Sequence, residues 1–269
     1  MSFLLERVWF AARLGPWWIC WETFQVLAIV AGAALLARRS RERAHRWAYV
    51  AGIVAAVPGA FALGCGGVFV RWLAAGAIGP HPDVELAGTG ALIAFLAAFA
   101  LACCRSGSAL VPAFDAVAPS IAVVLFFSRI GCFIGGCDFG RPSTLPWAMR
   151  FPVGTAAFRA QLDAGFIRTG QLLSLPVHPT QLYEAAAGLL LLCVLLGRPS
   201  RRTGGDIAFA VLGYAAARLL IDLARGDLAR GSLGLTSTQE MALAVLAFGL
   251  GAHLRGRIRG VVRTVLKVE

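Results

Sequence analysis

This 269-residue sequence carries unusually little charge. Asp, Glu, Lys and Arg together make up 14% of the residues, whereas a soluble domain usually contains roughly a quarter. Hydrophobic residues reach 58%, and the mean hydropathy is +0.74. A soluble protein of this size cannot hide so much apolar surface from water. The composition therefore excludes an ordinary soluble enzyme and predicts an integral membrane protein.

Other features are missing as well. The sequence contains no polar linker or low-complexity stretch, so residues 1–269 are predicted to form a single polytopic membrane domain. It contains no nucleic-acid-binding motif, and we expect no nucleic-acid partner. Its net charge of +11 comes from short basic tracts beside apolar stretches, which suits lipid headgroups and membrane topology. It also lacks the internal repeat of an inverted-repeat transporter.

Seven stretches are apolar and long enough to cross a bilayer, which takes about 20 residues of helix. We therefore expect an all-α integral membrane fold with about seven transmembrane helices. A glycine-, proline- and arginine-rich segment of about residues 135–178 separates the fourth from the fifth, and we expect it to be ordered and extracytoplasmic. The predicted spans are residues 17–37, 47–68, 86–104, 109–134, 180–196, 207–224 and 236–254.

The distribution of Lys and Arg predicts the orientation of the chain. With the N-terminus outside, the short inside segments hold 14 basic residues and the longer outside segments hold 9. The remaining two, Arg129 and Arg218, fall within predicted spans. Dense basic residues in short cytoplasmic loops follow the positive-inside rule. We therefore expect the C-terminus in the cytoplasm.

Ionisable residues inside predicted spans are costly and suggest function. Arg218 and Asp222 are four residues apart and share a helix face, which Arg225 continues one turn further out. They form either a structural pair that tethers one helix or part of an anion site. In the second interpretation Arg129, Arg218 and Arg225 face one cavity and bind a lipid phosphate, while Asp222 orients an arginine or takes a proton.

The stretch His178-Pro-Thr-Gln-Leu-Tyr-Glu184 opens the predicted fifth span. Glu184 there either interacts favourably with the helix dipole or belongs to a functional site. His178 is either a general base or a polar residue at the membrane interface.

Residues 128–142 form the most unusual local sequence, with glycines at 131, 135, 136 and 140. Such glycines permit close approach of the backbone to another helix or to a ligand. Cys132 and Cys137 lie five residues apart in this stretch. They form a disulfide, pack as free thiols, or have a reactive or metal-linked role. A disulfide would require the helix to end between them, because residues five apart on a helix lie about 140° apart.

Together these three blocks resemble the prolipoprotein diacylglyceryl transferase family. In the first block, the residues that match the family's signature are Arg129, Gly131, Phe133, Gly140 and Arg141. The second is the His178–Glu184 stretch, and the third contains Arg218, Asp222 and Arg225. The blocks follow the family's order and spacing, and the resemblance covers roughly residues 85–250.

The resemblance implies an enzyme of the bacterial inner (plasma) membrane. Such an enzyme moves a diacylglyceryl group from phosphatidylglycerol to the lipobox cysteine of a preprolipoprotein, and glycerol-1-phosphate leaves. It implies no metal and no cofactor, and its partners are phosphatidylglycerol and the signal-peptide region of preprolipoproteins. The implied catalytic residues are Arg129, Arg218, Glu184, Asp222 and His178. The implied substrate-binding residues are Arg129, Gly140, Arg141, Tyr183, Arg225, Thr89, Cys132 and Cys137.

The sequence also departs from the family's pattern. Cys132, Gly135 and Cys137 stand where the signature has Asn, Asn and Glu, and Thr89 stands where a His is expected. The general base is then Glu184, Glu22 or His178, or the reaction needs no strong base. Two alternatives follow from these departures. One is a non-catalytic lipid-binding or accessory membrane protein on the same scaffold. The other is a transferase of altered specificity, or a thiol–disulfide protein that uses Cys132 and Cys137.

Overall fold

The computed structural model describes residues 21–62, 88–198, 203–226, 234–236 and 238–249. In these ranges the regular structure is helical, as predicted, and strand pairing is limited to isolated bridges. For Glu22 and Thr89 only the backbone is described. The predictions about their side chains therefore lie outside the described part of the chain.

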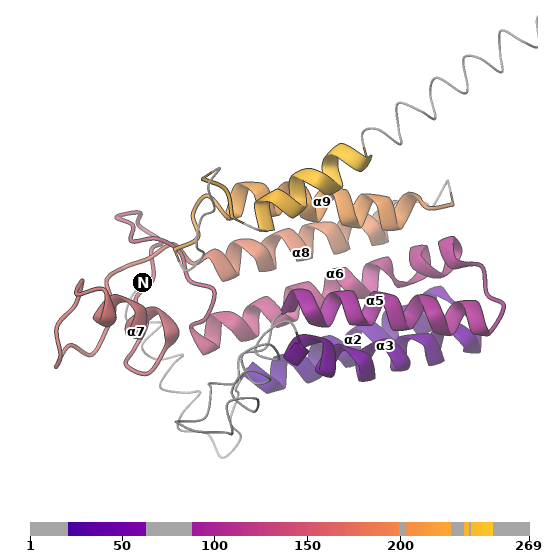
Figure 1. Ribbon diagram of the computed structural model, residues 1–269, viewed down its shortest axis with the longest axis horizontal. Coiled ribbons are helices and arrows are strands. Elements are labelled where there is room, and N and C mark those ends of the chain that lie inside the picture. Colours follow the sequence, from indigo (N-terminus) through magenta and orange to yellow (C-terminus); the bar gives the residue numbers. More distant parts are fainter. Residues whose placement is uncertain (1–20, 63–87, 199–202, 227–233, 237, 250–269) are drawn as a thin grey trace, which may run out of the picture. The chain divides into compact units, whose positions relative to one another are not determined.

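The described helices overlap the predicted spans (Figure 1), although α3 begins at Arg43, four residues before the predicted start of its span. A further helix covers residues 238–249, and α7 is a short helix in the segment between α6 and α8. Two of the described helices, α6 and α8, are long and apolar enough to cross a bilayer, and residues 90–105 form a shorter apolar helix. The protein is an all-α membrane protein, while the count of seven spans stays a prediction. The labelled helices are α2 (Trp21–Arg39), α3 (Arg43–Phe61), α5 (Gly88–Arg105), α6 (Leu110–Gly135), α7 (Ala156–Asp163), α8 (Thr180–Gly197) and α9 (Gly205–Ile221).

The chain divides into two compact units. One comprises residues 1–31, 118–201 and 205–269, and the other comprises residues 32–117 and 202–204. The prediction of a single domain over residues 1–269 stays a prediction.

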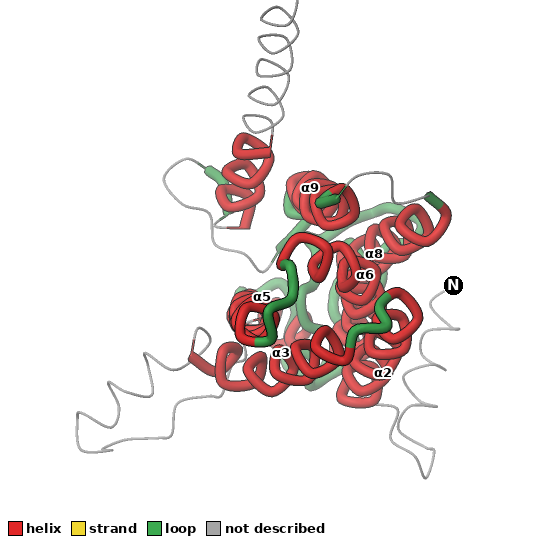
Figure 2. Tube along the Cα trace, turned by 90° about the vertical axis from the view of Figure 1, so that its right-hand side faces the viewer, coloured by secondary structure: helices red, strands yellow, loops and turns green. Residues whose placement is uncertain are grey.

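In the unit of residues 32–117, α3 packs along α5 (Figure 2). The Phe95 ring of α5 covers Gly52, and a β-carbon at Gly59 would lie 2.6 Å from the carbonyl oxygen of Gly90. The rings of Tyr49 and Phe95 form a T-shaped pair, with the ring centroids 5.5 Å apart. Glycines at the contact let two helix backbones approach closely, which is a common way to join helices in a membrane.

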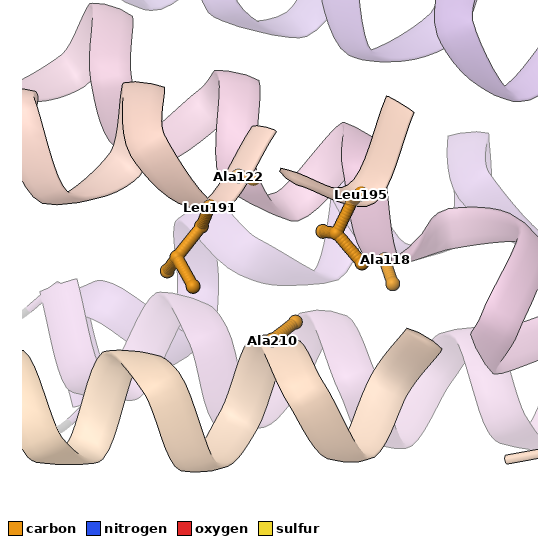
Figure 3. Close-up of a cluster of buried hydrophobic side chains, with 5 residues drawn as sticks. All are labelled: Ala118, Ala122, Leu191, Leu195 and Ala210. Carbon is orange, nitrogen blue, oxygen red and sulfur yellow. The ribbon is translucent and has the colours of Figure 1, made fainter. Parts of the chain in front are cut away.

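In the other unit, α8 packs against both α6 and α9. Figure 3 shows Leu191 and Leu195 of α8 directed toward Ala210 of α9. Ala118 and Ala122 of α6 complete this buried cluster. Because the alanines are small, the leucines fill the space between the helices without forcing them apart.

The segment between α6 and α8 has a small core and a helix of its own. Gly136 has φ +69°, a conformation that favours glycine, and the chain turns there away from the end of α6. Thr155 caps α7 by accepting a hydrogen bond from the Phe158 backbone N–H. The segment is therefore structured, while its extracytoplasmic location stays a prediction. Its core contains Phe133, Phe139, Phe151, Ala157 and Val177.

One sequence prediction about α9 is wrong. We expected Arg225 to continue the helix face of Arg218, but α9 ends at Ile221 and a turn follows. Arg225 instead forms an antiparallel bridge with Gly140. Hydropathy does not reveal this end, because the turn between Asp222 and Arg225 contains the apolar residues Leu223 and Ala224.

The close contact between α3 and α5 can be tested at Gly59. We expect Gly59→Ala to destabilise the protein by about 1–3 kcal/mol, because the added methyl group meets the backbone of α5 and cannot be accommodated without a shift. Thermal unfolding of the purified protein in detergent measures this. Gly88→Ala is the matched control, since a β-carbon there meets nothing within 4 Å. Equal losses in the two variants would contradict the proposed packing.

Candidate functional site

Glu184, in the second turn of α8, is the centre of a buried cluster of charges. Its side chain has no exposed surface. One oxygen, Oε1, accepts hydrogen bonds from Arg218 Nη1 at 2.6 Å and from Arg225 Nη1 at 3.1 Å. The other, Oε2, lies 2.8 Å from Arg129 Nε, an ion-pair distance without hydrogen-bond geometry, and accepts from the Tyr214 hydroxyl at 3.5 Å. Thus α6, α9 and the chain after α9 each supply one arginine, and the three predicted arginines meet.

Two further carboxylates complete the cluster. Asp138 accepts from Arg129 Nη1 at 2.6 Å and from Arg225 Nη2 at 2.8 Å. Asp222 lies 2.9 Å from Arg218 Nη2, which is the pairing predicted from their four-residue spacing. Three guanidiniums therefore face three carboxylates. Such a balance is needed because a buried charge without a partner is strongly destabilising.

Asp222 also anchors the start of the following helix. Its Oδ2 accepts hydrogen bonds from the hydroxyl groups of Thr236 and Thr238. Thr236 and Gln239 form a reciprocal capping box, in which each side chain binds the other residue's backbone N–H at 3.1 Å. Asp222 therefore connects Arg218 to the chain that enters the helix of residues 238–249.

Asp138 and Arg225 are positioned by a tight crossing of backbone segments, which contain Gly140, His178 and Ala224. The Gly140 N–H donates to the His178 carbonyl at 3.0 Å, and the Arg141 N–H donates to the Ala224 carbonyl at 2.8 Å. A β-carbon on Gly140 would lie 2.5 Å from the His178 carbonyl oxygen and 2.9 Å from that of Ala224. Gly140 was predicted to bind substrate, yet what approaches it closely in the structure is the protein's own backbone.

The first turn of α8 also binds the segment that contains Asp138. The Thr180 hydroxyl donates to the Asp138 carbonyl at 2.6 Å, and the Gln181 side-chain amide donates to the Cys137 carbonyl at 2.5 Å. These contacts fix the backbone on which the Asp138 carboxylate depends. Asp138 itself has a positive φ of +56°, which is uncommon for a residue other than glycine.

The cluster is open at one edge. The Arg129 side chain is 20% exposed and that of Asp138 is 28% exposed, whereas Arg218 and Arg225 retain only 9% and 3%. Burial by itself raises the pKa of the Asp138 carboxyl, but Arg129 and Arg225 lower it more, so the pKa lies below its ordinary value of 3.8. Of the three arginines, Arg129 is therefore the most accessible, and it lies beside an ionised Asp138.

His178 and Tyr183 form a second group near the crossing. His178 Nδ1 lies 3.3 Å from the Tyr183 hydroxyl, which accepts a hydrogen bond from Trp147 Nε1 at 2.7 Å. Arg141 is exposed, and its Nε donates to the Arg225 carbonyl at 3.2 Å. Arg141 is therefore bonded to the backbone of a cluster residue, while His178 and Tyr183 are bonded to each other.

Cys132 and Cys137 lie beside the open edge as free thiols. Their sulfurs and an oxygen of Asp138 lie within 4.8 Å of one another, a spacing that suits a metal ion. However, both Asp138 oxygens already accept from guanidiniums, so a cation would have to compete with two fixed positive charges. The hydrogen bond to Cys132 is the main cause that raises the pKa of Cys137, followed by burial, and a protonated thiol is a poor metal ligand.

Not every member of this site could be identified from the sequence. Asp138 was not singled out, although it lies in the glycine-rich block, and an acidic residue among arginines was the available signal. Gln181 lies in the His178–Glu184 stretch but was given no role there. Tyr214 gave no comparable signal, because its contact with Glu184 depends on how the helices pack. The roles assigned to the candidate residues stay predictions.

The sequence is similar to proteins of one family. The family model described as prolipoprotein diacylglyceryl transferase matches residues 24–255. A protein of Idiomarina loihiensis is 33% identical over 174 residues, which cover 62% of this chain and 59% of the relative. A protein of Clostridium tetani is 29% identical over 164 residues, covering 60% of each chain. One of Allorhizobium ampelinum is 36% identical over 168 residues, covering 58% of this chain and 52% of the relative.

All three relatives are named phosphatidylglycerol–prolipoprotein diacylglyceryl transferase. This chain spans between 52% and 60% of their length. The matched region of the family model contains the whole charge cluster described above.

The lowered pKa of Asp138 predicts an acid-sensitive contribution to stability. Because the carboxyl binds a proton less readily in the folded state, its contribution is complete above its ordinary pKa of 3.8 and is lost as the pH falls through the lower folded value. Below pH 3.8 we therefore expect the thermal midpoint of the wild type to fall more steeply than that of Asp138→Asn.

Asp163→Asn is the matched control, because Asp163 is an exposed aspartate at the end of α7. This variant should follow the wild-type slope. Parallel curves for the wild type and Asp138→Asn would show that the pairing of Asp138 with its arginines does not stabilise the fold.

Proposed function

The chain belongs to the prolipoprotein diacylglyceryl transferase family, and we propose that it transfers a diacylglyceryl group from phosphatidylglycerol to a cysteine thiol of a preprolipoprotein. The names of the relatives support the reaction class. The structural observation that carries the proposal is the meeting of three arginines, with Arg129 at the open edge. A guanidinium in that position can bind a phosphate with two parallel hydrogen bonds.

In the proposed reaction the sulfur of the acceptor thiolate attacks the carbon of the diacylglyceryl group that bears the phosphate ester. The S–C bond forms, the C–O bond breaks, and glycerol-1-phosphate leaves with the electron pair of the broken bond. The thiol proton passes to a base or to water at the open edge, because the thiolate is the nucleophile. Arg129 stabilises the charge that grows on the leaving phosphate.

The fully buried carboxylates have a different role in this proposal. Glu184 and Asp222 have no exposed surface, so they position arginines and do not touch the substrate. Glu184 holds Arg129, Arg218 and Arg225 together, and Asp222 holds Arg218. Asp138, at the open edge, pairs with Nη1 of Arg129, whereas Glu184 pairs with its Nε.

The setting of the reaction belongs to the same proposal. The chain crosses the bacterial plasma membrane about seven times, with the N-terminus outside and the C-terminus in the cytoplasm. Phosphatidylglycerol and the signal-peptide region of a preprolipoprotein approach from the membrane and from its outer face. The apolar surfaces of α6 and α8 and the distribution of basic residues support this arrangement.

A second candidate is binding of an anionic lipid without turnover. One observation favours it: the three guanidiniums are already balanced by three carboxylates, so the cluster is stable without an anion. The two candidates differ in whether glycerol-1-phosphate is released.

The proposal is tested by supplying the purified protein with phosphatidylglycerol and a lipobox peptide. We expect glycerol-1-phosphate release and peptide lipidation that depend on the peptide's cysteine. Arg129→Ala should lower the rate by about 10²–10³-fold, as expected when a group that stabilises developing negative charge is removed. Arg129→Lys should recover little of this, because an ammonium group does not reproduce the paired hydrogen bonds.

Arg159→Ala is the matched control, since Arg159 is exposed on α7, and it should retain the wild-type rate. Full activity in a folded Arg129→Ala variant would refute the assignment of the phosphate site. Binding of phosphatidylglycerol by the wild type with no release of glycerol-1-phosphate would favour the second candidate.

A further inference from the structure

Two thiols lie at the open edge of the charge cluster, and the proposed transfer gives them no task. Cys132 is buried in the last turn of α6, and Cys137 lies two residues beyond the end of that helix. Their sulfurs lie within 4.8 Å of each other. Transfer to an external acceptor cysteine does not require a pair of thiols in the enzyme itself.

The backbone brings these thiols together in a way that a continuous helix cannot. Residues five apart on an α-helix point about 140° away from each other. Here α6 ends at Gly135, and Gly136 takes a positive φ of +69°. The chain therefore folds back, and the Cys137 sulfur lies 3.7 Å from the Cys132 carbonyl oxygen. This meets the condition for a disulfide that the sequence alone left open.

The surroundings of Cys137 are not those of a packing cysteine. It is partly exposed, and its sulfur lies 3.9 Å from Asp138 Oδ2. A cysteine that only fills space lies among apolar groups, whereas this thiol faces a carbonyl oxygen, a carboxylate and a second thiol. The arginines that hold Asp138 also disfavour a metal ion between the three ligands.

We propose that Cys132 and Cys137 are a redox-active dithiol that closes reversibly into an intramolecular disulfide. The oxidant is a small-molecule or protein disulfide. The thiolate of one of the two cysteines attacks that disulfide and expels one external thiolate. The thiolate of the other cysteine then attacks the mixed disulfide, forms the Cys132–Cys137 bond and expels the second external thiolate. The two external sulfurs take up two electrons, and the two protons lost by the cysteines protonate the thiolates that leave.

Closure of this disulfide would act on the open edge. It would join the last turn of α6, one turn beyond Arg129, to the residue that precedes Asp138. Arg129 and Asp138 are the two least buried charged residues of the cluster. The redox state of the thiols would therefore be coupled to the positions of Arg129 and Asp138. The dithiol itself does not depend on the proposed transfer reaction, so the two proposals can fail separately.

The test uses the full chain in detergent, equilibrated in buffers with different ratios of oxidised to reduced glutathione. Free thiols are then alkylated, and the protein is digested with trypsin. Both cysteines fall in one peptide, residues 130–150, because Arg141 precedes proline and is not cleaved. We expect a single reversible transition between doubly alkylated and disulfide-closed peptide, with a steepness that corresponds to two electrons. Cys193→Ser, at an exposed position of α8, should leave it unchanged.

Cys137→Ser should abolish the transition and leave Cys132 open to alkylation or glutathionylation. Three results for folded wild-type protein would overturn the proposal. The first is double alkylation at every ratio, and the second is a disulfide that persists in fully reducing buffer. The third is protection from alkylation that a chelator removes without any disulfide-closed peptide, which would indicate a metal site.

Discussion

The structure of the site depends on the need to neutralise one carboxylate, Glu184, that has no access to solvent. A buried charge of this kind is tolerated only when opposite charges and hydrogen bonds surround it. The three arginines that surround it come from α6, from α9 and from the chain after α9. Satisfying Glu184 therefore fixes how these parts of the chain meet α8. The apolar contacts of α6, α8 and α9 could slide or rotate more easily than this network of directed bonds.

The other features of the site follow from the same network. Asp138 and Asp222 balance the charge that Glu184 alone leaves, and each connects a further segment to the arginines. Among the described charged residues of the cluster, Arg129 and Asp138 keep the largest exposed fractions. The functional proposal and the dithiol proposal both concern this open edge, which a lipid phosphate would approach in the first and an external disulfide in the second. In the proposed reaction, the buried members position the arginines and the partly exposed members contact the substrate.

The helices and the arginines could be predicted from the sequence, whereas much of the site could not. Long apolar runs located the helices, and four-residue spacing predicted the pair of Arg218 and Asp222, because both signals are local. The helix end at Ile221 was missed because an apolar turn follows it. The role of Asp138 depends on residues nearly ninety positions away in sequence, such as Arg225, and on a backbone reversal at Gly136. Tertiary contacts of this kind leave no periodic pattern.

The most direct test of this account is the stability of Glu184→Gln, which keeps the size of the side chain and removes its charge. The change leaves three guanidiniums with two carboxylates, and removing one partner of a buried ion pair costs about 3–5 kcal/mol. Thermal unfolding in detergent should therefore show a large fall in the midpoint. Glu240→Gln, at an exposed position, should show almost none. Similar midpoints for the two variants would contradict the claim that Glu184 organises the site.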